Sequence, residues 1–135
     1  MKGLEEIGRN IVDSALKVHK ALGPGLLESA YQQCLANELR KRGFKVETEV
    51  TLPVCYENLA IDAGYRLDMI VDNQVIVENK AVEQLIPVHS AQIITYLKLG
   101  NFRLGYLINW NVPLIKDGIF RFANGIPEPR WRVAP

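Results

Sequence analysis

Apolar residues recur with a helical period in three parts of the chain. Between residues 4 and 22 they follow one another at steps of three and four, at Ile7, Ile11, Ala15, Val18 and Leu22. This spacing places them on one face of a helix. The Gly-Pro-Gly triplet at residues 23–25 ends that helix, because proline and glycine do not continue a helix cheaply. We expect two further helices, over residues 26–42 and 88–99, each followed by a glycine.

Elsewhere the pattern changes to that of β-strands. Valine, threonine and aromatic residues are concentrated in residues 44–56, apolar and polar positions alternate in residues 65–71, and residues 75–81 form a third such segment. Residues 102–110 are almost continuously apolar, which is typical of a strand covered on both faces. Two short apolar segments flank a Lys-Asp-Gly turn, so residues 114–122 are expected to form a small hairpin.

The order of these elements predicts the fold class. Two helices precede three strands that are close enough in sequence to form an antiparallel meander. The third helix then crosses over to a strand parallel to the third one. We therefore expect a mixed α/β (α+β) protein with a central, mixed four-stranded sheet flanked by helices and followed by the C-terminal hairpin. The 135 residues are the size of one domain, and residues 125–135, with three prolines, are expected to form an extended tail.

The turn between the second and third strands determines which residues share a face of the sheet. A three-residue loop at residues 72–74 sets Asp68 opposite Glu78, with Lys80 on the same face. The other face then carries the apolar positions Tyr65, Leu67, Met69, Val71, Val75 and Val77. A two-residue loop would place the two acids on opposite faces and would mix the apolar residues, so the three-residue loop is preferred.

Two carboxylates on one face need a partner. At about 4 Å, two like charges repel by about 4 kcal/mol at an effective dielectric constant of 20. A shared proton or a cation between Asp68 and Glu78 would relieve this, and hard oxygen ligands suit Mg²⁺. Lys80 would then steer a phosphate or orient a water molecule. The alternative is that both acids are solvated surface charges and that Lys80 pairs with one of them.

Two helices carry further candidate residues. Glu28 lies in the first turn of the second helix, and Tyr31 follows on the same side. In the third helix His89, Gln92 and Tyr96 share one face at steps of three and four. The alternatives are that Glu28 only complements the helix dipole and that the polar face of the third helix only faces water.

Composition narrows the possible classes of protein. The chain has a net charge of +1, so it lacks the overall charge of a strongly basic nucleic-acid binder. No apolar segment approaches the length of a membrane span, and the N-terminal residues do not have the pattern of a signal peptide. Two cysteines, Cys34 and Cys55, are too few for a disulfide framework, and we expect a cytoplasmic protein.

The candidate residues together resemble a known family. Residues 25–31, Gly-Leu-Leu-Glu-Ser-Ala-Tyr, match the GxxExxY signature, and Asp68, Glu78-Asn79-Lys80 and Gln92–Tyr96 follow in order. In these motifs the chain resembles the GxxExxY protein family, a branch of the PD-(D/E)XK nuclease superfamily, over residues 7–122. The superfamily's restriction-endonuclease-like αβββαβ core agrees with the order of elements predicted above.

The resemblance implies roles for individual residues. Asp68 and Glu78 would bind the metal, Mg²⁺ or Mn²⁺, and Glu28 would reach it directly or through water. Asn79, between the acid and the lysine, is the fourth expected metal-binding position. Lys80 would activate the attacking water or stabilise charge on the phosphate.

The helix after the third strand carries the other implied residues. Gln92 and Tyr96 match a Q-x-x-x-Y element that supports the site and contacts the substrate. We therefore expect Gln92, Tyr96 and Glu28 to line the same cleft as the two acids. The chain departs from the usual pattern at Leu67, where proline is common, and at Asn79, where an apolar residue is usual. Burying the Asn79 amide costs roughly 1–3 kcal/mol unless it finds partners.

These residues predict a Mg²⁺-dependent nuclease that hydrolyses phosphodiester bonds in DNA or RNA with a metal-activated water. The alternative is a non-catalytic module that binds nucleic acid or protein on a nuclease scaffold. An acid/base enzyme for a small molecule, built on Glu28 and His89, is a third interpretation.

Overall fold

The protein, in a computed structural model, is described over residues 2–125, so the expected tail lies outside the described residues except for Gly125. The helices are α1 (Leu4–Leu22), α2 (Glu28–Lys41) and α3 (Pro87–Leu99), with a short 3₁₀ helix η1 (Ile115–Gly118). The strands are β1 (Val46–Thr51), β2 (Val54–Tyr56), β3 (Leu59–Ile61), β4 (Arg66–Val71), β5 (Val75–Lys80), β6 (Leu104–Asn109) and β7 (Ile119–Ala123). All three expected helices are present.

The central sheet has five strands in the order β1-β4-β5-β6-β7. β5 and β6 are parallel and are joined through α3, as the sequence predicts, while the other neighbouring strands are antiparallel. The expected mixed α+β class and the restriction-endonuclease-like arrangement are therefore confirmed. No helix within residues 2–125 is long and apolar enough to cross a lipid bilayer.

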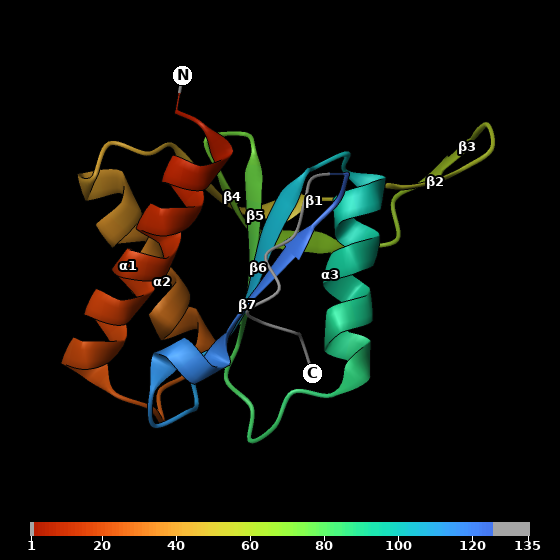
Figure 1. Ribbon diagram of the computed structural model, residues 1–135. Helices are drawn as coiled ribbons and strands as arrows, with labels where there is room; N and C mark the ends of the chain where they lie inside the picture. Colours follow the sequence, from red (N-terminus) through yellow and green to blue (C-terminus); the bar gives the residue numbers. More distant parts are fainter. Residues whose placement is uncertain (1, 126–135) are drawn as a thin grey trace.

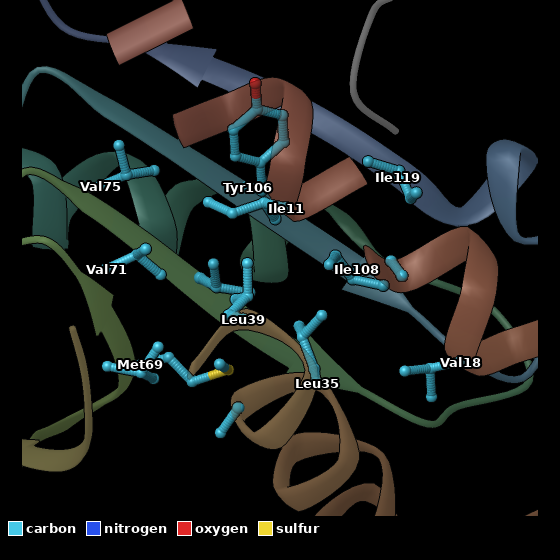
Figure 2. Packing of buried hydrophobic residues seen from close by; sticks show 14 of the residues in the cluster. Ile11, Val18, Leu35, Leu39, Met69, Val71, Val75, Tyr106, Ile108 and Ile119 are labelled. Atoms are coloured by element: carbon cyan, nitrogen blue, oxygen red, sulfur yellow. The ribbon is translucent and has the colours of Figure 1, made fainter. Parts of the chain in front are cut away.

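Helices cover both faces of the sheet (Figure 1). α1 and α2 pack side by side on one face, and α3 lies on the other. Figure 2 shows the larger apolar core, in which Ile11 of α1 and Leu35 of α2 gather with Met69 and Ile108 of the sheet. A second core lies under α3 and includes Ile93 and other buried residues of the opposite face. Cover on both faces accounts for the continuously apolar β6.

The predicted register between β4 and β5 is confirmed. Val71 pairs with Val75 and Met69 with Val77, around the three-residue loop 72–74. Within this loop Asp72 and Asn73 have φ values of 51° and 57°. Aspartate and asparagine tolerate this left-handed conformation better than most residues, which explains why the loop forms here.

One predicted strand and the predicted hairpin differ from the structure. The segment 44–56 is not one strand, because β1 ends at Thr51 and β2 pairs instead with β3 in a separate two-stranded sheet. Pro53 between them has no N–H for a continuous ladder. In Figure 1 this β2–β3 arm projects away from the body of the molecule. The predicted hairpin at 114–122 is η1 followed by β7, which adds a fifth strand beside β6.

The predicted apolar face of β4 is also wrong at its first half. Met69 and Val71 lie in the core under α1 and α2, but Leu67 lies in the core under α3. Tyr65 contacts Tyr96 of α3. The change of face occurs at Asp68, next to the strand-β1 residue Glu49, whose φ of 53° interrupts the regular backbone.

Candidate active site

The regular ladder between β4 and β5 ends just before the predicted acids. Met69–Val77 is the last paired position. Beyond it, the Asp68 N–H donates to the Glu78 carboxylate at 2.8 Å, and the Asn79 N–H donates to the Asp68 carboxylate at 2.8 Å. Side-chain oxygens thus accept the hydrogen bonds that carbonyl groups accept in a regular ladder. Both carboxylates are held between the two strands.

The burial of these acids raises the pKa of each. Glu78 is only 3% exposed. Burial and then the nearby Asp68 charge raise the pKa of Glu78 to about 8. Burial and, to a smaller extent, the Glu28 charge raise the pKa of Asp68 to about 6, against the lowering effect of the Asn79 N–H. At neutral pH the pair therefore retains a proton, or it attracts a cation.

Lys80 lies at the end of β5 and is half-buried. Its positive charge lowers the pKa of both Asp68 and Glu78, so it lies close to the pair. Among residues 2–125 it forms no ion pair within 4 Å. Its ammonium group is therefore available to a ligand at the site.

Glu28 reaches the same region from the start of α2. It lines a cleft of about 610 Å³ together with Asp68 and residues of β1, among them Thr48 and Glu49. Within the described part of the chain, no three His, Cys, Asp or Glu side chains stand close enough to hold a metal ion together. Glu28 thus faces the acid pair across the cleft and does not complete a three-carboxylate set with it.

The GxxExxY segment has a clear local structure. Gly25 has a φ of 101°, which glycine adopts without strain. The Tyr31 hydroxyl donates to the Gly23 carbonyl and accepts the Leu26 N–H, so it closes the loop before α2. Glu28 is the first residue of α2, between the glycine and the tyrosine. The spacing of the three residues therefore positions the acid at the cleft.

Behind the acids, Asn79 is fully buried on the α1–α2 side of the sheet. Its side-chain oxygen accepts the Trp110 indole N–H at 2.9 Å, and its amide nitrogen donates to Gln32 and to the Met69 sulfur at 3.3 Å each. Trp110 in turn stacks on Tyr31, with ring centroids 4.8 Å apart. The side chain of Asn79 is thus fully engaged, and only its main chain faces the acids.

Gln92 and Tyr96 lie on the other side of the acids. The Gln92 amide donates to the Tyr96 hydroxyl at 2.8 Å, and both residues line a second hollow, of about 690 Å³, against α3. Burial raises the pKa of Tyr96, and the charges of Glu78 and Asp68 raise it further, so its ring is close to the acids. The expected single cleft with Glu28 is therefore two hollows, one on each side of the acid pair.

Sequence reasoning missed three residues around the site. Glu49 adds a negative charge that raises the pKa of Asp68, and it accepts a hydrogen bond from Gln32 at 3.0 Å. Trp110 supports Asn79, and Tyr65 stands against Tyr96. Glu49 carries no motif and Trp110 follows a strand as an ordinary apolar residue, so neither had a recognisable signal. Tyr65 stands against Tyr96 only because β4 changes face at Asp68, and the regular alternation of the sequence did not predict this.

The basic cluster at residues 40–42 has structural partners. Arg42 pairs with Asp13 at 2.8 Å and with Glu38 at 3.0 Å. Arg40 donates to the Val46 carbonyl at 2.8 Å. These contacts tie α2 to α1 and β1, so the cluster has a role in packing at the end of the helix.

The half-buried Asp68, the buried Glu78 and Lys80 thus lie together where the ladder between two central strands ends. A family model described as the PD-(D/E)XK nuclease superfamily matches residues 5–122, so the chain belongs to this superfamily. Its membership supports nuclease and hydrolase activity. Searches of curated proteins and of solved structures found no match.

Proposed function

We propose that the protein is a Mg²⁺- or Mn²⁺-dependent nuclease that hydrolyses phosphodiester bonds in DNA or RNA. The observation that carries the proposal is the gap between β4 and β5, where the carboxylates of the half-buried Asp68 and the buried Glu78 replace the ladder. Lys80 stands beside them without an ion-pair partner among the described residues. A purely structural pair of acids would be stabilised by neighbouring cations, as Glu38 is by Arg42 and Lys17.

The residues in the gap fit a hard divalent cation. Asp68 and Glu78 offer carboxylate oxygens, which Mg²⁺ prefers. The Asn79 N–H points at Asp68, and in a strand the carbonyl of the same residue points to the same side. Asn79 therefore contributes its main-chain oxygen, and Glu28 acts across the cleft through water. When bound, the cation supplies a Lewis acid and lowers the pKa of a water molecule.

The protein's own groups perform the remaining steps. Lys80 binds a phosphate oxygen and stabilises the negative charge that develops during hydrolysis. Glu28, across the cleft from Asp68, accepts a hydrogen bond from the attacking water and orients it. Gln92 holds the Tyr96 hydroxyl, and this pair contacts the substrate on the α3 side.

We assign the protein further to the GxxExxY branch of the superfamily. The support is local: Gly25, Glu28 and Tyr31 act as one unit in which the tyrosine closes the loop and the glutamate faces the acids. We also propose a cytoplasmic location, since Cys34 and Cys55 are free thiols, which are usual in a reducing compartment.

The experiment is a cleavage assay of the purified protein on single- and double-stranded DNA and RNA, with Mg²⁺ or Mn²⁺ and with EDTA. Cation-dependent cleavage that is lost in Lys80→Ala supports the proposal. Isothermal titration calorimetry with Mg²⁺ measures cation binding directly. Nucleic-acid binding without cleavage of any substrate would favour the alternative, a non-catalytic binding module on a nuclease scaffold.

A further inference from the structure

The hollow against α3 has the composition of a site for a flat, polar-edged ligand. Its volume of about 690 Å³ is within the usual range for small-molecule pockets. One wall is apolar and includes Val54 of β2 and Val88 and Leu99 of α3. The rings of Tyr65 and Tyr96 and the polar groups of His89 and Gln92 also line the hollow.

Tyr65 offers an aromatic face to this hollow. The residue is 47% exposed. Its ring stands edge-on to Tyr96, with centroids 6.4 Å apart and an interplanar angle of 60°. The buried Tyr96 therefore fixes the orientation of Tyr65 and leaves part of its surface open to a stacking partner.

The polar groups of the hollow are also held in defined orientations. His89 accepts the Ile86 N–H at its Nδ1 atom, at 3.1 Å. The neutral ring then carries its proton on Nε2, so His89 presents a donor. The Gln92 amide is oriented by its hydrogen bond to Tyr96. Aromatic and apolar walls with a few fixed hydrogen-bonding groups match a nucleobase, which has apolar faces and a polar edge.

The position of the hollow selects this occupant over a peptide or a second copy of the chain. The charges of Glu78 and Asp68 act on Tyr96, so the hollow adjoins the acids that would hold the scissile phosphate. A nucleotide bound there places its base next to the reacting group. In a duplex the bases are stacked and paired, so none of them can enter without leaving the helix.

We infer that this hollow receives an unpaired base adjacent to the scissile phosphate, with Tyr65 as its stacking platform. This inference rests on the proposed nuclease function and narrows its substrate to single strands or to unpaired nucleotides. Tyr65 is then a specificity-determining residue outside the acid–lysine motif.

The test measures binding and cleavage separately. Fluorescence anisotropy with a labelled single strand of about 12 nucleotides, or with the matching duplex, is measured in a Lys80→Ala background so that the probe stays intact. Tyr65→Ala should weaken single-strand binding by about 5- to 150-fold, the usual range for one stacked base, while Tyr65→Phe keeps the ring and the affinity. Tyr56→Ala is the matched control, because Tyr56 is 68% exposed on the β2–β3 arm and does not line the hollow.

Cleavage by the protein with Lys80 intact distinguishes the two claims. A preference for single strands that Tyr65→Ala removes supports the inference. Equal cleavage of single strands and duplexes, with unchanged binding in Tyr65→Ala, overturns it and leaves the nuclease function standing. Binding of single strands that depends on Tyr65, without cleavage of any substrate, supports the hollow and rejects the proposed activity. Circular dichroism melting confirms that each variant is folded.

Discussion

The two ends of the β4–β5 pair use the same strands in different ways. At the closed end, from the loop 72–74 to Met69–Val77, the backbones pair regularly and apolar side chains fill both cores. At the open end the backbone N–H groups of Asp68 and Asn79 donate to carboxylates instead. The closed end fixes the register, and that register brings the two acids together at the open end.

The acids at the open end lower the stability of the fold when they are charged, and the closed end has no such cost. Buried carboxylates with raised pKa values destabilise the fold when they ionise, whereas the apolar closed end is insensitive to pH. The network of Asn79, Trp110 and Tyr31 supports the open end from the α1–α2 side. The comparison therefore predicts that a substitution at the closed end lowers stability and leaves activity, whereas a substitution at the open end lowers activity.

The largest expected contrast is between Ile76→Ala at the closed end and Glu78→Gln at the open end. Ile76 is fully buried, and its truncation should lower the free energy of unfolding by about 2–5 kcal/mol. Activity per folded molecule should remain. Glu78→Gln should lower activity more than about 100-fold, because even outer partners of metal ligands cost roughly 10- to 100-fold. Urea unfolding and a cleavage assay at a temperature where both variants are folded measure the two effects.

The contrast has a clear negative outcome. If Ile76→Ala reduced the activity of the folded protein as strongly as Glu78→Gln does, the two ends would not be separable. The closed end would then have a role in the chemistry beyond setting the register.

The second prediction concerns pH in the absence of cations. The pKa of Glu78 is about 8 in the folded state against an ordinary value of 4.5, and that of Asp68 is about 6 against 3.8. The folded state binds these protons more tightly than the unfolded chain. The stability they contribute is therefore present at acid pH and lost as the pH rises toward 8. The Tm in EDTA should therefore fall as the pH is raised from about 4 to about 8.

The double variant Asp68→Asn/Glu78→Gln is the matched control for this pH effect. It should lack this loss and be more stable than the native protein at pH 8. Mg²⁺ at a hundredfold excess over Kd should stabilise the native protein by about 2.7 kcal/mol and leave the double variant unchanged. An equal response of both proteins to Mg²⁺ would mean that the cation binds elsewhere.

The sequence was sufficient to predict most of the closed end and the identity of the acids. The spacing of the apolar residues determines the helices, and the turn residues 72–74 determine the register of β4 and β5. Both are local signals in the sequence. The β2–β3 arm, the fifth strand and the change of face at Asp68 were missed. Each of these depends on which segments pair in space. Glu49 became a neighbour of Asp68 only through the pairing of β1 with β4.

The partner of Asn79 shows the same limit. Trp110 lies 31 positions further along the chain, and its indole reaches Asn79 only because β6 is parallel to β5 in a defined register. No local pattern in the sequence records this contact. Because buried polar groups are almost always hydrogen-bonded, the buried Asn79 amide indicated that a distant donor exists. The sequence did not identify that donor.

The third prediction tests this hydrogen bond. Asn79→Leu leaves the Trp110 indole N–H without its acceptor and should cost about 1–3 kcal/mol of stability. Trp110→Phe should also destabilise, because it leaves the Asn79 oxygen unpaired. The two losses should not add, since the double variant removes both partners at once. Urea unfolding of the four proteins gives the coupling free energy, and strictly additive losses would contradict a stabilising role for the hydrogen bond.

The smallest expected effect is that of Tyr31→Phe. Its hydroxyl bonds to Gly23 and Leu26, which lie near the surface where water can replace it, so the stability cost should be about 0.5–1.5 kcal/mol. The ring still stacks on Trp110, so the core should be preserved. Because the loop positions Glu28, cleavage should also fall by a few fold. In a Glu28→Gln background the same change should cost stability but no further activity. A loss of activity that persists there would show that Tyr31 acts on the site by a route other than Glu28.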